Sequence, residues 1–208
     1  MKAIYCAGEQ ARVVVDILQA VGDTEDIIFV DDDPIRHTEQ IAGNEVIGGL
    51  DEFTAAYPAN TECVVAFGDR PGVRLKLADQ LSERGYGFFN AVHPSTQISE
   101  AVEFGEGLMI NAQSYIGPDV VVRDHVLIDS SVTISHESVL EDGSTITPNA
   151  TLAGGVVVEK DAYVGPSATV VEDLTVGPGA VVGAGAVVTE DVPADTTVVG
   201  VPASPLEE

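Results

Sequence analysis

The chain has few basic residues for its size. Only nine Lys and Arg stand against 34 Asp and Glu among 208 residues, which gives a formal net charge of -25 at pH 7. Such a surface repels both the phosphates of nucleic acid and the headgroups of an anionic membrane. The composition therefore argues against nucleic acid and against membranes as partners.

Long apolar runs are also missing. No stretch approaches the ~20 consecutive apolar residues of a membrane-spanning helix, and the apolar start of the chain is interrupted at Glu9, too early for a signal peptide. Cysteine occurs only as Cys6 and Cys63, each within an apolar run, which favours two buried, reduced thiols over a disulfide. These absences predict a cytoplasmic protein.

The acidic excess is spread along the whole chain. Residues 1–93 carry seven basic and 16 acidic side chains, and residues 94–208 carry two basic and 18 acidic ones. At ~1 M salt the screening length falls to about 3 Å, so the repulsion among these charges largely vanishes. We therefore expect a halophilic protein, with an ordinary acidic protein as the alternative.

The second half of the chain contains a repeat. From Ile98 to Val188 an apolar residue recurs every six positions without a break, and Gly or Ala often follows it. A period of six fits neither a helix nor a plain strand, but it fits a solenoid in which three six-residue units close one triangular coil. The pattern resembles the hexapeptide-repeat left-handed parallel β-helix, here of about five coils over residues 93–208.

Residues 1–92 follow a different pattern. Short apolar runs alternate with segments of helical spacing: runs at 2–6, 26–31 and 62–67, helical segments at 10–20 and 71–84. This order predicts an α/β domain, a small parallel sheet with helices on its faces.

Ligands of such sheets bind beyond the carboxyl ends of the strands, which are here residues 7–10, 31–34 and 68–70. The run from Asp31 to Asp33 at one of these ends is either a solvated turn or part of a ligand site. Gly8 lacks the further glycines of the dinucleotide fingerprint, which argues against a nicotinamide dehydrogenase.

His136 is the candidate for chemistry within the repeats. An 18-residue coil places Gly154 over it, and a glycine there lets a ligand approach an exposed backbone N–H. Glu137 follows directly, and a neighbouring carboxylate fixes the tautomer of an imidazole, as a general base requires. A solvated turn residue is the alternative. His125 lies 11 residues away and does not stack with His136, so no metal site is expected.

Several segments follow one another along the chain in an order that is characteristic of a known family. They are IYCAGEQARVVVDIL, FVDDDP, GGLDEF and NAVHPS, followed by ISHES, ITPNATLAGGVVV and GAVVGAGAVVTEDVP. This succession spans essentially the whole chain and resembles the sialic acid O-acetyltransferase family. That family of hexapeptide-repeat acyltransferases includes the N-acetyltransferases that act on UDP-4-amino-sugars in glycan biosynthesis.

The resemblance implies a homotrimer that uses acetyl-CoA as cosubstrate and acetylates an amine or hydroxyl of a nucleotide-linked amino sugar. His136 would be the general base, Glu137 would support it, and the N–H of Gly154 would face the thioester carbonyl. Further coenzyme contacts would fall on Thr145, Pro166 and Ala184. The nucleotide-sugar loops would include Gly8, Glu9, Gln10, Asp31, Asp32 and Gly49.

The sequence departs from this family in three places. The loop from Cys6 to Ala11 keeps only one glycine, Gly8, where the family has several, and it carries Glu9. Thr145 replaces a histidine, and the tail after residue 203 has no basic residue. These departures keep open a second hypothesis, a non-catalytic trimer that binds sugar nucleotides or serves as a scaffold. A third, an acetyltransferase for a small amino acid such as serine, is disfavoured because such enzymes usually carry helices in place of the α/β domain.

Overall fold

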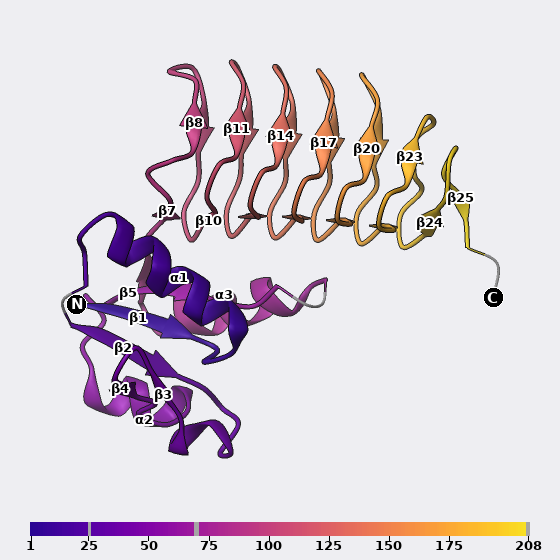
Figure 1. Cartoon of the computed structure of the whole chain (residues 1–208). Coiled ribbons are helices and arrows are strands. Elements are labelled where there is room, and N and C mark those ends of the chain that lie inside the picture. Colours follow the sequence, from indigo (N-terminus) through magenta and orange to yellow (C-terminus); the bar gives the residue numbers. More distant parts are fainter. Residues whose placement is uncertain (25, 69–70, 207–208) are drawn as a thin grey trace.

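The computed structural model of the protein describes residues 1–24, 26–68 and 71–206. A small α/β region is followed by a long β-solenoid, and the α/β region lies against the first coils of the solenoid (Figure 1). The predicted fold class is thereby confirmed. Within the described ranges, no helix combines the length and the apolar character needed to cross a membrane.

The α/β region is built on four parallel strands in the order β2-β1-β5-β6. They are β1 (Lys2–Tyr5), β2 (Ile27–Val30), β5 (Glu62–Val65) and β6 (Gly87–Phe88). Side chains alternate between the two sides of the sheet. Ile4 and Phe29 pack with α1 (Glu9–Ala20), whereas Ala3 and Tyr5 pack with α2 (Leu50–Ala56) and α3 (Val73–Ser82).

Three predicted strands and two predicted helices are confirmed. Four further elements were not predicted from the sequence: the short α2, the fourth strand β6, the 3-10 turn Arg36–Thr38, and the hairpin of β3 (Gln40–Ile41) and β4 (Asn44–Glu45). All four are short, and packing on the sheet stabilises segments that have little periodicity of their own.

The solenoid has three faces of stacked, two- or three-residue parallel strands, and the antiparallel β25 (Ser204–Pro205) closes its C-terminal end. Face A contains β7 (Ala91–Val92), β10 (Met109–Ile110), β13 (Leu127–Ile128), β16 (Thr145–Ile146), β19 (Tyr163–Val164), β22 (Val181–Val182) and β24 (Thr197–Val199). Face B contains β8 (Gln97–Ile98), β11 (Tyr115–Ile116), β14 (Thr133–Ile134), β17 (Thr151–Leu152), β20 (Thr169–Val170) and β23 (Val187–Val188). Face C contains β9 (Glu103–Phe104), β12 (Val121–Val122), β15 (Val139–Leu140), β18 (Val157–Val158) and β21 (Thr175–Val176).

Residues 18 apart stack upon one another, as Met109 does on Leu127. The solenoid makes about six turns, so the expectation of about five was slightly low. The apolar residues of the six-residue period are buried from Ile110 to Val188, whereas Ile98 is 37% and Phe104 is 39% exposed at the first coil. The core therefore runs the length of the solenoid and opens at its N-terminal end.

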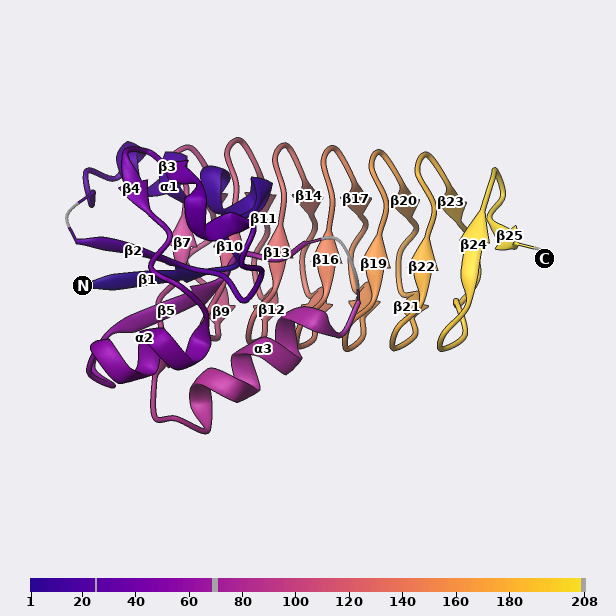
Figure 2. The ribbon, with the colours of Figure 1, turned by 90° about the horizontal axis from the view of Figure 1, so that it is seen from below.

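The α/β region packs on face A and on the corner between faces C and A, here called corner CA (residues 123–126 and 141–144 in the contacting coils). Met109 and Leu127 of face A share a buried apolar cluster with α1. The α3 helix lies along corner CA (Figure 2), where Leu75 sits close to Gly143. Both cysteines are free; Cys63 is buried and Cys6 is half-buried.

Candidate active site

His136 lies at the corner between faces B and C, here called corner BC (residues 135–138, 153–156 and 171–174). Its ring is well exposed, at 61% of the side chain, and its Nδ1 lies 2.9 Å from Oε2 of Glu137. When Nδ1–H donates to this carboxylate, Nε2 is left with a free lone pair that can accept a proton. The pair thus has the form of an oriented general base.

Gly154 stacks directly against the imidazole. A Cβ at this position would lie 2.5 Å from Cε1 and 2.7 Å from Nε2 of His136, so no larger residue fits without displacing the ring. The coils hold this register on both sides, because Gly155 N–H donates to the His136 carbonyl and Asp173 N–H donates to the Gly154 carbonyl. In the part of the chain that the structure describes, no acceptor pairs with the Gly154 N–H, which leaves it available to an oxyanion.

A cavity of about 380 Å³ opens at this corner. It is lined by His136, Glu137, Ala153, Gly154, Gly155, Glu172 and Asp173. Three of these residues carry carboxylates, and such a wall attracts a cationic group such as a protonated amine. His136, Glu137 and Gly154 were predicted from the sequence, whereas Glu172 and Asp173 were not. The 18-residue spacing could have indicated Asp173, which lies 18 residues after Gly155 and stacks on it.

A second pocket lies in the α/β region, beyond the carboxyl ends of β1, β2 and β5. Its volume is about 290 Å³, and it is lined by Cys6, Gly8, Glu9, Gln10, Asp31, Asp33, Arg36, Ala66, Phe67 and Gly68. Gly8 is the N-cap of α1, so the first N–H groups of this helix face the pocket region. Residues 69 and 70, which the sequence analysis placed at this strand end, lie outside the described residues.

Asp31 holds the loops of this pocket together. Its Oδ2 accepts from Ala7 N–H at 2.7 Å and its Oδ1 accepts from Asp33 N–H at 2.9 Å. Burial, together with the nearby carboxylates of Asp31 and Asp32, raises the pKa of the Cys6 thiol to about 12. Cys6 is therefore a neutral wall of the pocket at physiological pH.

Asp32 and Gly49 line a different cavity, of about 360 Å³, together with His37, Arg84 and neighbouring residues. Asp32 Oδ1 accepts from Leu50 N–H at 2.9 Å, and Oδ2 accepts from the Tyr5 hydroxyl. The residues expected in the sugar-nucleotide loops thus divide between two cavities. Arg36, which lines the cavity beside Gly8, was not predicted as a site residue.

The residues expected to contact the coenzyme do not surround His136 in one chain. Pro166 and Ala184 are exposed at the corner between faces A and B, where Gly185 N–H donates to the Pro166 carbonyl. Thr145 is buried on face A, and its Oγ1 accepts from Arg74 at 2.9 Å. Its hydroxyl is therefore occupied within the chain.

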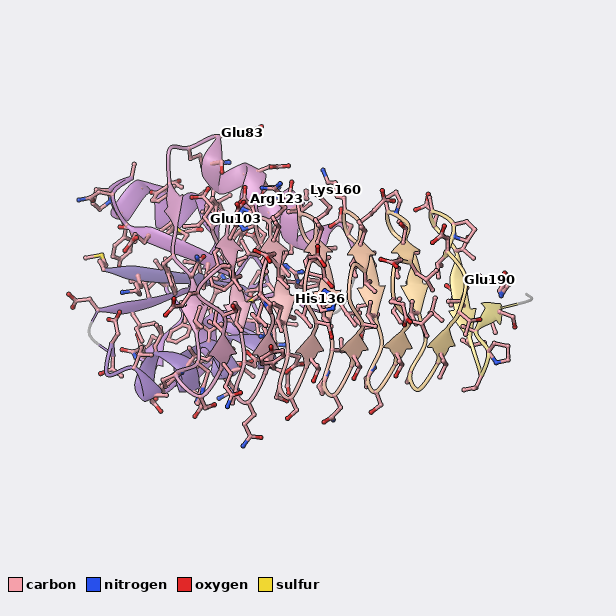
Figure 3. All side chains as sticks on the ribbon, turned by 90° about the horizontal axis from the view of Figure 1, so that it is seen from above. Glu83, Glu103, Arg123, His136, Lys160 and Glu190 are labelled. Carbon is pink, nitrogen blue, oxygen red and sulfur yellow. The ribbon has the colours of Figure 1, made fainter. Side chains whose placement is uncertain are left out.

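Corner BC also faces away from the α/β region. In a triangular coil, the corner between faces B and C lies opposite face A, on which the α/β region packs. Figure 3 looks onto the solenoid from the side away from that region and labels His136, with Arg123 and Lys160 lying toward α3. The pocket beside Gly8 and the His136 cavity therefore do not meet within one chain.

Comparisons with known proteins agree with this architecture. The PglD N-terminal domain family matches residues 3–81, and the bacterial transferase hexapeptide family matches residues 155–190. PerB from Caulobacter crescentus, crystallised with CoA and GDP-perosamine, is 32% identical with a TM-score of 0.92, over 99% of this chain and 97% of that chain. The chain belongs to the PglD-type hexapeptide acyltransferases. The resemblance drawn from the sequence is thereby confirmed.

Two further solved structures are similar over their whole length. The acetyltransferase domain of PglB from Neisseria gonorrhoeae, in complex with acetyl coenzyme A, is 29% identical with a TM-score of 0.91, over 99% of this chain and 98% of that chain. WeeI from Acinetobacter baumannii is 27% identical with a TM-score of 0.69, over 99% of each chain. A comparison with curated protein sequences found no match.

Proposed function

We propose that this protein is an acetyltransferase that transfers the acetyl group of acetyl-CoA to the amine of a nucleotide-linked amino sugar. The observation that carries the proposal is the stack of His136 on Gly154, with Glu137 bonded to Nδ1. The relatives support the two substrates, since PerB was crystallised with CoA and GDP-perosamine and PglB with acetyl coenzyme A.

The acceptor is proposed to be an amine rather than a hydroxyl. The cavity at His136 is walled by the carboxylates of Glu137, Glu172 and Asp173. A protonated amino sugar is attracted to this wall by its charge, whereas a neutral hydroxyl lacks this attraction. The ammonium loses one proton before it can attack, and the carboxylate wall and Nε2 of His136 are the acceptors present.

The proposed reaction uses three groups of this corner. The amine nitrogen attacks the thioester carbon, and Nε2 of His136 takes the proton that the nitrogen loses. Glu137 holds the resulting imidazolium through its bond to Nδ1, and the Gly154 N–H meets the oxyanion of the tetrahedral intermediate. Collapse of the intermediate breaks the carbon–sulfur bond, and the CoA thiolate leaves and receives the proton from His136.

The proposed assembly is a homotrimer in which each site lies between two copies. Within one chain the Gly8 pocket and the His136 cavity lie on opposite sides of the solenoid, so a neighbouring copy has to supply one of them. The same arrangement places Pro166 and Ala184 of one copy beside His136 of the next, along a coenzyme groove. Thr145 is left out of this site because Arg74 occupies its hydroxyl.

The test is the release of CoA thiol from acetyl-CoA with a panel of acceptors. The panel contains UDP- and GDP-linked 4-amino sugars, the matching 4-hydroxy sugars, serine, and a reaction without acceptor. We expect thiol release and an N-acetylated product only with nucleotide-linked amino sugars. Release with serine alone would support the amino-acid acetyltransferase instead.

Binding of acetyl-CoA in the absence of an acceptor distinguishes the proposed acetyltransferase from a non-catalytic scaffold. Acetyl-CoA stabilises a protein that binds it in the folded state, so the melting temperature rises with its concentration. The proposed acetyltransferase shows this rise, whereas a scaffold with no coenzyme site shows no change.

A further inference from the structure

The guanidinium of Arg74 is the most buried charge that the structure describes. Arg74 is the second residue of α3, and it is only 3% exposed. All its acceptors are neutral oxygens. The donor–acceptor distances are 2.6 Å from Nε to the His125 carbonyl, 2.6 Å from Nη1 to the Phe67 carbonyl, and 2.8, 2.9 and 2.9 Å from Nη2 to the Gly143 carbonyl, the Ser144 carbonyl and Thr145 Oγ1.

These acceptors come from two different parts of the molecule. Phe67 belongs to the loop that follows β5, whereas His125, Gly143, Ser144 and Thr145 belong to successive coils of the solenoid. One planar fork thus ties the loop to the coils, and each of its three nitrogens donates to at least one of these oxygens. A lysine cannot reproduce this, because its ammonium is a single point charge without the fork geometry.

Docking of α3 alone does not account for this burial. Leu75, the next residue, already packs α3 against Gly143 of the same corner. Burial lowers the pKa of Arg74 to about 10, although the negative charge of Asp161 acts to raise it. The side chain therefore stays charged at neutral pH. A buried charge costs folding free energy even when it is hydrogen-bonded, and an apolar side chain would dock the helix without that cost.

The loop that Arg74 holds is a wall of the Gly8 pocket. Phe67 and Gly68 both line this pocket. Gly68 lies so close to face A that an added Cβ would be 3.1 Å from the Leu127 side chain. The wall is therefore fixed to the solenoid at two adjacent residues, by the hydrogen bond from Arg74 and by contact with Leu127.

We propose that Arg74 is a positioning residue that holds the Phe67–Gly68 wall of the sugar-nucleotide pocket at a fixed place on the solenoid. The acceptor bound in that pocket then keeps a constant position on the solenoid of its own copy, and through the proposed trimer a constant distance from His136 of the neighbouring copy. The assignment of the pocket to a sugar nucleotide rests on the proposed function, whereas the fixing of the wall is independent of it.

The first test compares Arg74→Lys and Arg74→Met with Leu75→Ala, which weakens the docking of α3 without touching the Phe67 carbonyl. With Arg74→Lys we expect the KM for the nucleotide-linked amino sugar to rise at least about tenfold, as the loss of charged hydrogen bonds implies. The KM for acetyl-CoA should stay within about twofold of the wild type. With Leu75→Ala the melting temperature falls, and both KM values stay near those of the wild type.

An unchanged sugar-nucleotide KM in Arg74→Lys would overturn the proposal. Equal increases of this KM in Arg74→Lys and Leu75→Ala would also overturn it, because Arg74 would then only help to dock α3 on the solenoid. Arg74→Lys retains the charge and decides the question if Arg74→Met fails to fold.

The second test needs no substrate. The chain contains no tryptophan, so Phe67→Trp places a single fluorescent reporter in the wall and leaves the backbone carbonyl in place. Adding Arg74→Lys to this background should shift the emission to longer wavelength as the wall becomes solvated, whereas adding Leu75→Ala should not. If Arg74→Lys leaves the emission wavelength unchanged, the positioning role of Arg74 is overturned, even if the protein uses a sugar nucleotide. If the emission shifts but the protein binds no sugar nucleotide, the proposed function is overturned and the positioning role stands.

Discussion

At the scale of single residues, Gly154 and the carboxylate of Glu137 hold the His136 imidazole in the orientation that a general base requires. The ring is exposed, yet its orientation is fixed by the bond to Glu137 and by the backbone of Gly154 beneath it. The sequence could predict this group because residues 18 apart must stack in a regular coil. It could not predict the burial of Thr145, because Arg74 reaches that residue from a different part of the chain.

His125 is a buried histidine whose titration should affect folding. It is 7% exposed, its Nδ1 has no partner among the described residues, and its ring packs edge-on against Phe88. Burial lowers its pKa, with Arg74 acting in the same direction and the carboxylates of Asp124, Asp142 and Asp79 opposing.

The unfolded chain therefore binds a proton at His125 more readily than the folded chain does. The contribution of His125 to stability is complete above the ordinary value of 6.5 and is lost as the pH falls from there through the lowered pKa. Melting temperatures between about pH 7.5 and pH 5 should fall more steeply for the wild type than for His125→Gln. Parallel curves for the two proteins would show that His125 does not titrate in this way.

At the scale of elements, the solenoid follows from its sequence more directly than the α/β region does. Every coil repeats the same spacing, so the spacing found in the other coils predicts the inward-facing residues of each coil. The α2 helix and the β3–β4 hairpin have too few residues for a period, and they depend on contacts with the sheet. The docking of α3 depends on Arg74 and Leu75. These residues belong to no repeat, so the sequence pattern does not indicate their contacts.

Ile134 and Ile98 occupy the same column of face B but differ in their surroundings. Ile134 is fully buried, whereas Ile98 lies at the open first coil and is 37% exposed. Ile134→Ala should lower the free energy of unfolding by about 2–5 kcal/mol, and Ile98→Ala by about 1 kcal/mol or less. Urea denaturation measures both, and equal losses would mean that another surface covers the first coil.

At the scale of the whole molecule, the account places each active site between two copies of the chain. Gly8 lines the proposed sugar-nucleotide pocket, and an added Cβ there meets nothing within 4 Å, so Gly8→Trp should obstruct the pocket with little strain at its own backbone. Gly8→Trp and His136→Ala should each inactivate the proposed homotrimer. Co-expression of the two variants at equal levels should recover about a quarter of the wild-type activity, because about three quarters of randomly assembled trimers are mixed and one of the three junctions in each mixed trimer combines an intact pocket with an intact His136. A site contained within one copy predicts no recovery.

The net charge of -25 leads to a second prediction at this scale. Repulsion among the acidic groups weakens as salt screens them, so the melting temperature should rise between about 0.1 M and about 3 M KCl. A flat or falling curve would remove the halophilic interpretation and leave an ordinary acidic protein. The fold and the proposed chemistry do not depend on this outcome.

The most direct test of the proposed catalysis is the acetyl transfer rate of His136→Ala, measured together with its acetyl-CoA binding. The account predicts that the variant assembles and binds acetyl-CoA as the wild type does, and that kcat for the nucleotide-linked amino sugar falls about 100- to 10,000-fold. Transfer at the wild-type rate by His136→Ala would contradict the account.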